Sequence, residues 1–456
     1  MAAYSHLGQL MKKIIVIFCS IFFFYSHLTQ ANVLYDIKDP KLAATMDNLI
    51  LSADTVEMFW HAYNHPSRPI TPPQAMQRII DDALLAQHAR QTLPSHILNT
   101  TNSVGFANDV MLEDRATALI RKTYQKALVE KIQSLPKGLE SLFSFNHDIT
   151  TEKLAELMTL KAALMINANP KQEAAAKRTV VATLNLSAAG LTSDIKELTL
   201  WDIYHRQNVQ GRLAIHNADL NYLKSQVKQR IGSLMVLAWA EKNISAQDFA
   251  AIQQILLNEQ HKTRLLESMG LHADVHDDNP ALREKAKSIS EEKIKQYYQD
   301  NQDEFEVVER VKARHIRVAS QALADQVVAE LKAGLDFSAA IKKYSIAEDK
   351  NASVPGSLGW LQRSDKKRSW LHAVAFMQQA GTVSAPFRSP QNQGEIVYEI
   401  IFADERIDGH LSYSDPTVHY EASRDIALKE LREEFIALQS QLRANATIHL
   451  NKAALR

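Results

Sequence analysis

The sequence contains very little cysteine. Its single cysteine among 456 residues is Cys19, which lies inside an apolar N-terminal segment. The remainder of the chain can therefore form no disulfide and offers no thiol nucleophile.

The chain also lacks an excess charge of either sign, since 52 basic residues balance 52 acidic ones. No overall field therefore favours nucleic acid or an anionic membrane as a partner. Glycine and proline number only 13 each, and no long low-complexity segment occurs. With 46% hydrophobic and 23% charged residues, the composition is that of a globular protein, and the length predicts two to four domains. Neither a glycine-rich phosphate loop nor a Gly-x-Ser-x-Gly elbow is present.

The N-terminus has the pattern of a secretory signal. Lys12 and Lys13 precede the apolar run 14–25, and Ala31 follows at a plausible cleavage position. The pattern predicts a signal peptide over residues 1–31 and a periplasmic protein. The alternative is an uncleaved tether in the inner membrane, for which the run is short, since a spanning helix needs about 20 apolar residues.

Apolar residues at helical spacing dominate residues 32–304 and predict a large all-α region of packed helices. We divide it into 32–205 and 206–304. Two predicted helices begin after an N-cap residue, one after Thr71 and one after Ser290. Three further helices are predicted over 108–133, 151–168 and 217–241. Two segments, 49–59 and 213–223, could each be a strand that leads into a helix. Their similarity indicates either a duplicated strand–helix module or a chance likeness between two amphipathic helices.

A series of short sequence motifs begins at Val311 and covers about ninety residues. A strand that carries His315 is followed by two helical motifs, a glycine turn at Pro355–Trp360, a short apolar helix and a closing strand. In chain order the motifs are VKARHIRV, SQALADQVVAELKAG, DFSAAIKKYSIAED, PGSLGW, AVAF with TVSAPFRS, and EIVYEIIFADE.

The order and spacing of these motifs resemble the parvulin (rotamase) family of peptidyl-prolyl isomerases. The resemblance implies a four-stranded antiparallel sheet flanked by helices, which we place at 305–408. The preceding connector and the helical region resemble the periplasmic foldases of the SurA, PrsA and PpiD type. That resemblance implies an α+β protein in which the parvulin domain is inserted into the helical region. The C-terminal helix, within 409–456, would pack back on that region.

The resemblance also implies a site. His315 matches the family's first-strand histidine and is the candidate catalytic residue. The candidate substrate-binding residues are Leu371, Trp370, Phe376 and Trp360.

Several family positions differ in this chain. Ala347 stands at the family's Cys or Asp position, with the carboxylates of Glu348 and Asp349 next to it. The methionine that forms an apolar wall of the site in the family corresponds to Lys366 or Lys367 in this chain. The family's second histidine corresponds to Ile396.

The sequence therefore predicts a periplasmic parvulin-type isomerase that assists folding of unfolded or proline-containing exported polypeptides. The alternatives are a weakly active or inactive parvulin fold that acts as a holdase or assembly factor, and a dedicated component of an export or surface-polymer system. We expect no cofactor and no metal. A metal-like spacing occurs in His272 and His276 with Asp277 and Asp278. We expect this segment to be an exposed loop and not a metal site.

Overall fold

The computed structural model describes residues 32–99, 105–160, 167–272, 279–390 and 395–455. The predicted signal segment 1–31 lies outside these residues. The chain divides into two units, which we call the sheet unit (Leu282–Glu430) and the helical unit (His27–Ala281 with Leu431–Arg456). Because the helical unit is built from two stretches of chain that flank the sheet unit, the predicted insertion is confirmed. Among the described residues, no helix combines the length and the apolar character needed to cross a membrane.

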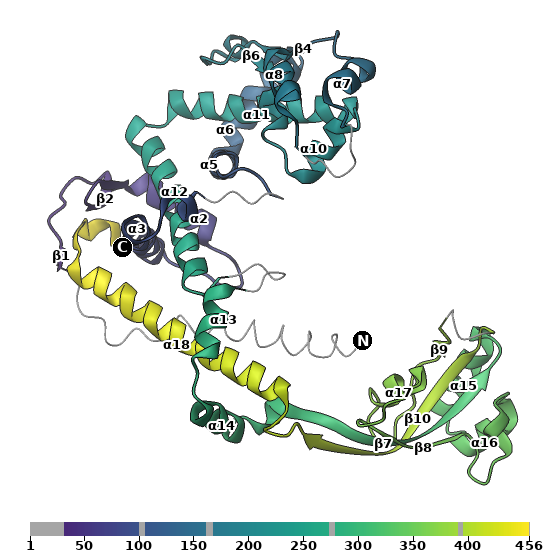
Figure 1. The fold of residues 1–456 in the computed structure, drawn as a ribbon. Helices are drawn as coiled ribbons and strands as arrows, with labels where there is room; N and C mark the ends of the chain where they lie inside the picture. The colour runs from purple at the N-terminus through teal and green to yellow at the C-terminus, as the bar shows by residue number, and fades with distance from the viewer. Residues whose placement is uncertain (1–31, 100–104, 161–166, 273–278, 391–394, 456) are drawn as a thin grey trace. The chain divides into compact units, whose positions relative to one another are not determined.

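The helical unit consists mainly of helices (Figure 1). Most of them begin at a residue whose side chain caps the helix. Thr71 and Gln74 form a capping box at the start of α3, as the prediction at Thr71 requires. Asp219 caps α11, the longest helix of this unit's N-terminal stretch. The helices are α2 (Ala53–Tyr63), α3 (Pro72–Thr92), α4 (Ser95–Leu98), α5 (Asn108–Thr123), α6 (Gln125–Gln133), α7 (Thr151–Met158), α8 (Pro170–Arg178), α9 (Leu200–Tyr204), α10 (Val209–His216), α11 (Leu220–Asn243) and α12 (Ala246–Ser268).

Three predictions for this region are wrong in detail. The helix expected over 151–168 ends at Met158. The helix expected over 108–133 is broken at Tyr124, whose ring packs on Trp239 with the ring centroids 5.0 Å apart. The segment 213–223 contains no strand: it comprises the end of α10, a turn at Ala218 with φ of 57°, and the start of α11. The proposed strand–helix duplication therefore fails, although 49–59 does form a strand followed by a helix.

The helical unit also contains two small sheets, so the all-α expectation needs correction. One has the order β1-β11-β2-β3, and the other has the order β4-β5-β6. These strands have three to five residues, too few for a period-two pattern to be recognised. They are β1 (Asn32–Leu34), β2 (Leu42–Met46), β3 (Leu49–Ser52), β4 (Phe143–Phe145), β5 (Val180–Leu184), β6 (Glu197–Thr199) and β11 (Thr447–Leu450).

The C-terminal helix α18 (Pro416–Asn445) crosses the unit boundary, and its part from Leu431 onward packs within the helical unit as predicted. Its residues Phe435, Leu438 and Leu442 join an apolar cluster built on Leu85 of α3 and Leu265 of α12. The strand β11 then pairs parallel with β1 and antiparallel with β2. The end of the chain is thereby tied to its first described strand.

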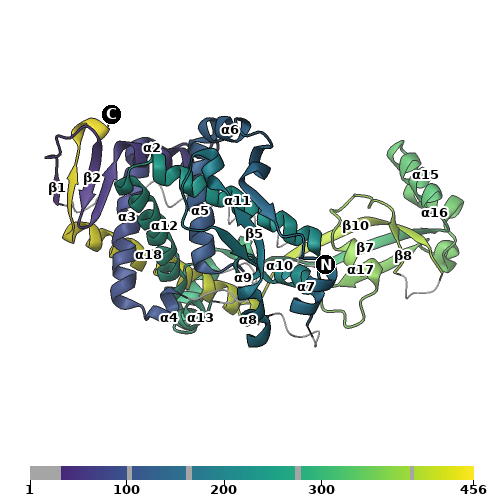
Figure 2. The ribbon, with the colours of Figure 1, turned by 90° about the horizontal axis from the view of Figure 1, so that it is seen from above.

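The sheet unit holds the predicted four-stranded antiparallel sheet, in the order β8-β7-β10-β9. Figure 2 shows three of its strands, β7, β8 and β10. Ser290 caps α14, as predicted. The elements are α13 (Pro280–Lys287), which begins just before the unit boundary, α14 (Glu291–Asp300), β7 (Glu306–Val318), α15 (Gln321–Lys332), α16 (Phe337–Tyr344), β8 (Ser357–Gln362), α17 (Trp370–Ala375), β9 (Phe387–Arg388) and β10 (Tyr398–His410).

Alternation along the two central strands divides the sheet into two faces. Ile316, Val318 and Ile400 face α15 and α16, whereas Ala313 and Ile401 face α17. His315 lies two residues after Ala313 on β7, and side chains two apart on a strand point to the same face. The side chain of His315 therefore belongs to the α17 face. This partition decides which of the predicted site residues can meet.

Candidate functional site

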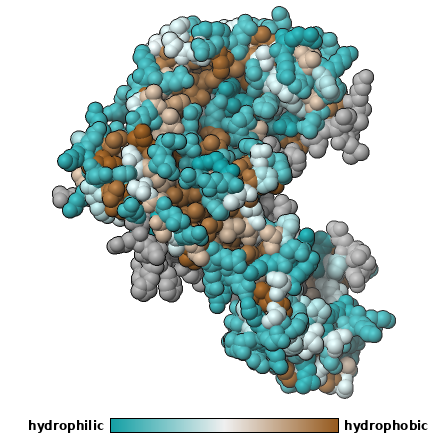
Figure 3. Space-filling model, turned by 60° about the vertical axis from the view of Figure 1, so that its left-hand side comes forward, coloured by the Kyte–Doolittle hydropathy of each residue, from teal (hydrophilic) through white to brown (hydrophobic). Residues whose placement is uncertain are grey.

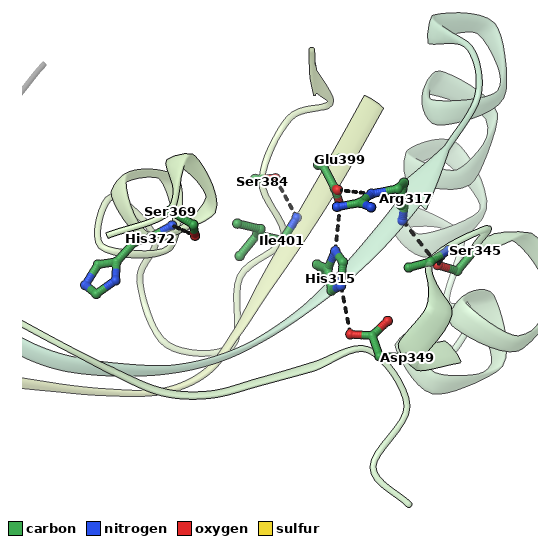
Figure 4. A network of polar contacts seen from close by, with 10 residues as sticks. His315, Arg317, Ser345, Asp349, Ser369, His372, Ser384, Glu399 and Ile401 are labelled. Carbon is green, nitrogen blue, oxygen red and sulfur yellow. Dashed lines mark hydrogen bonds and ion pairs between the residues drawn. The ribbon is translucent and has the colours of Figure 1, made fainter. Parts of the chain in front are cut away.

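The centre of the candidate site is a buried ion network on the two central strands. His315 stands directly opposite Ile401, and Arg317 stands opposite Glu399. The Nδ1 of His315 lies 2.7 Å from Oε2 of Glu399, and Nε2 lies 3.0 Å from Oδ2 of Asp349 (Figure 4). Arg317 donates from Nε to Oε1 of Glu399 at 2.6 Å. Both ring nitrogens of His315 thus face carboxylate oxygens.

The electrostatics of the network favour a protonated His315. Burial by itself opposes the charged imidazolium, because only 4% of the residue is exposed. The hydrogen bonds and charges of Glu399 and then Asp349 outweigh this penalty and raise the pKa of His315 above its ordinary value of 6.5. A charged imidazolium donates from both nitrogens, which matches two carboxylate partners.

Asp349 is the member of this trio that reaches the surface, with 35% of its side chain exposed. Its Oδ1 accepts no hydrogen bond within the described part of the chain. The carboxylate sits in a short 3-10 turn, Glu348–Asn351. This turn is held because Gly356 donates from its N–H to the Asp349 carbonyl, at 3.2 Å, and accepts from the N–H of His315, at 2.8 Å.

Gly356 makes this arrangement possible. Its φ is +63°, and a Cβ there would stand 2.5 Å from the carbonyl oxygen of His315. A side chain would therefore push the turn that carries Asp349 away from the strand. The motif PGSLGW (Pro355–Trp360) was expected to be a turn. It is a turn only as far as Gly356 and continues as the strand β8.

Three of the predicted substrate-binding residues gather on the α17 face. Leu371 is only 6% exposed and packs with Ala313 and Ile401. Trp370 meets the ring of Phe387 edge-on, with centroids 5.3 Å apart. Phe376 stacks on His372 at 4.7 Å, and Figure 4 shows His372 pointing away from His315. These side chains form an apolar wall on the same face as the ion network.

Trp360 does not join them. It stands opposite Lys312 on β7, and directly paired residues project to the same face of a sheet. Lys312 has the opposite parity to Ala313, so Trp360 belongs to the α15–α16 face. There its ring lies under the Arg310 guanidinium, 4.6 Å away.

The remaining family positions contribute little to the network. Ala347 is buried, Lys366 and Lys367 are exposed, and Ile396 is 51% exposed and precedes β10. His276, Asp277 and Asp278 lie outside the described residues.

The sequence reasoning missed Glu399. A carboxylate inside the apolar run Tyr398–Phe402 was the available signal, because an unpaired charge is not tolerated on a buried strand.

Comparison with known proteins agrees with this geometry. Residues 289–402 match the family model described as the PPIC-type PPIASE domain. This part of the chain is a parvulin-type domain. The match covers the whole sheet as far as Phe402 and includes His315, Asp349 and Glu399.

Curated relatives match part of the chain. A Foldase protein PrsA from Caldanaerobacter subterraneus is 28% identical over 188 residues, which are 41% of this chain and 58% of the relative. A Chaperone SurA from Methylococcus capsulatus is 46% identical over 67 residues, which are 15% of this chain and 14% of the relative. The chain thus spans less than two thirds of either relative's length.

Solved structures give low overall scores. A SurA-like chaperone structure from Campylobacter jejuni is 22% identical, with a TM-score of 0.20, and the match covers 49% of this chain and 83% of that one. PrsA from Bacillus subtilis is 20% identical, with a TM-score of 0.19, and the match covers 56% of this chain and 89% of that one. At these scores the structural likeness decides nothing about function.

Proposed function

We propose that the protein is a peptidyl-prolyl cis-trans isomerase that assists the folding of exported, proline-containing polypeptides. The observation that carries the proposal is the charged His315 held between Asp349 and Glu399 on a parvulin-type sheet, beside an apolar wall. The PPIC-type domain match and the names of the curated relatives, a foldase and a chaperone, support the same reading.

The reaction needs no covalent chemistry. Rotation about a peptide bond is opposed by amide resonance, with a barrier of about 18–20 kcal/mol. The planar amide carries more charge on its oxygen than the twisted amide does. A surface that removes water from the amide, and a fixed charge that disfavours the planar form, both lower the barrier.

The network assigns distinct roles to its members. Since both nitrogens of His315 are engaged by carboxylates, His315 acts as a positioning residue rather than touching the client. We assign to Asp349, whose side chain is the most exposed of the three, contact with the client amide, for which its buried Oδ1 is the oxygen without a hydrogen bond among the described residues. Glu399 keeps His315 charged, and the wall of Leu371, Trp370 and Phe376 contacts the proline ring.

An isomerisation assay on a short X–Pro peptide tests this assignment. We expect His315→Ala and Asp349→Asn each to lower kcat/KM about tenfold or more, because the fixed charge is lost or no longer positioned. Asp325→Asn on α15, an exposed carboxylate on the other side of the sheet, should leave the rate unchanged. An equal rate for all four proteins would contradict the assignment of the site.

A holdase function is the second candidate, and one feature favours it. Glu399 and Asp349 occupy both nitrogens of His315, which leaves few polar groups free to act on a client. If the unaltered protein does not accelerate isomerisation even at high concentration, while it still suppresses client aggregation, the parvulin-type domain serves binding alone.

Export is the remaining part of the proposal, and it is supported by the lysine pair and apolar run at 12–25. Cleavage after Ala31 predicts a periplasmic form that begins at Asn32. N-terminal sequencing of the protein from a periplasmic extract checks this expectation. A full-length form that is recovered only with membranes would instead indicate an uncleaved tether.

A further inference from the structure

The helical unit contains an apolar groove of about 660 Å³ between α5, α6 and α11. Its walls include Leu128, Ile132, Leu139, Met235 and Val236. In Figure 3 apolar side chains also reach the surface in patches between hydrophilic residues on the face in view. A groove of this size is within the range of sites that bind peptide side chains or small ligands.

The backbone creates the groove in two ways. The chain is interrupted at Tyr124 between α5 and α6, and both helices contribute lining residues to the groove together with α11. Gly232, in the middle of α11, then leaves one wall without a side chain. Glycine inside a helix costs roughly 0.5–1 kcal/mol relative to alanine. A Cβ at Gly232 would make only an ordinary contact, 3.7 Å from Leu139, so crowding does not require glycine at this position.

The charged residues among those that line the groove all have the same sign. Arg121, Lys122 and Lys228 line it, and no aspartate or glutamate is among its lining residues within the described chain. Lys228 is paired with the exposed Glu140 at 2.9 Å, and Lys122 donates to the His61 carbonyl at 3.0 Å. With Lys228 balanced by Glu140, Arg121 and Lys122 leave a local positive excess at the groove in a protein whose total charge is zero.

We propose that this groove binds extended segments of client polypeptides in which apolar residues are flanked by aspartate or glutamate. The apolar walls receive the side chains, and the three cations select the flanking charge. The inference rests on the proposed role as a folding assistant and names the client sequence that the helical unit takes. It requires no isomerisation, so it can be tested separately from the parvulin-type site.

The first arm measures shape. The probe is a fluorescein-labelled peptide without proline, with alternating leucine and valine between two pairs of glutamates, and its binding to the full-length protein is followed by anisotropy. We expect Gly232→Phe to weaken binding about tenfold by filling the groove, whereas Gly232→Ala keeps the groove open and binds as the unaltered protein does. Thermal melting of both variants establishes that each is folded. Equal binding by the two variants would overturn the proposal.

The second arm measures charge. The same peptide with lysine pairs in place of the glutamates should bind about tenfold more weakly at low salt, and added salt should reduce the difference. Arg121→Glu combined with Lys228→Glu should reverse the preference, and His315→Ala should leave it unchanged. Equal affinity for both peptides would overturn the proposal. Displacement of the probe by a peptide of residues 11–31, or loss of its binding as protein concentration rises, would also overturn it, in favour of the chain's own N-terminus or of a second copy.

Discussion

Replacing Arg443 with methionine is expected to lower the free energy of unfolding of the helical unit by about 3–5 kcal/mol. Arg443 lies on α18 and forms a two-pronged ion pair with Asp81 of α3, and both side chains are about nine-tenths buried. Removing the arginine would leave the Asp81 carboxylate buried, with a hydrogen bond from the Gln77 amide, 3.1 Å from Oδ1, in place of the ion pair. An uncompensated buried charge is among the most destabilising changes that a single substitution makes.

Urea unfolding measures this effect if the two units are observed separately. Trp60, Trp201 and Trp239 belong to the helical unit, so fluorine NMR of 5-fluorotryptophan reports on that unit. The double variant Arg443→Met with Asp81→Leu should recover most of the loss, because both charges are then removed. Arg432→Met, on the same helix, should change stability by less than about 0.5 kcal/mol. An unaltered unfolding curve for Arg443→Met would show that the pair does not hold α18 in place.

The helices were predictable where burial and capping agree in the sequence. The start of α3 is marked by Thr71, by the prolines after it and by a stripe of apolar residues at helical spacing. The C-terminal helix could be placed from its leucines, and the structure adds that Asp81 and Arg443 fix it. That pair joins residues 362 positions apart, and no local pattern reports such a contact.

What could not be predicted depends on long-range packing. The helix break at Tyr124 has neither glycine nor proline beside it. It coincides with the packing of the Tyr124 ring on Trp239, a residue far along the chain. The strand β11 could not be foreseen because its partners, β1 and β2, lie at the other end of the chain.

The candidate site shows the same division. The position of His315 on the first strand followed from the order of the sequence motifs. Its partners did not: Glu399 comes from a strand 84 residues later, and Asp349 enters through a turn that depends on Gly356. The departures at Ala347 and Ile396 suggested a depleted site, whereas the structure places carboxylates against both nitrogens of the histidine.

Replacing Glu399 with glutamine is expected to destabilise the sheet unit by about 2–4 kcal/mol, since it removes a buried charge that two cationic groups share. Glu399 is completely buried and accepts from both His315 and Arg317. Trp360 and Trp370 report on this unit in the same fluorine experiment. Glu405→Gln, an exposed glutamate on the same strand, is the matched control and should change little.

The pH dependence separates the charge of Glu399 from its shape. A histidine whose pKa is raised in the folded protein contributes stability that is fully present below its ordinary value of 6.5. This contribution is lost as the pH rises through the folded pKa, so the sheet unit should become less stable toward alkaline pH. Glutamine at position 399 keeps the shape but not the charge, so the pKa of His315 should fall and the alkaline loss should shrink. An NMR titration of His315 that gives the same pKa in both proteins would mean that Asp349 alone maintains the charge.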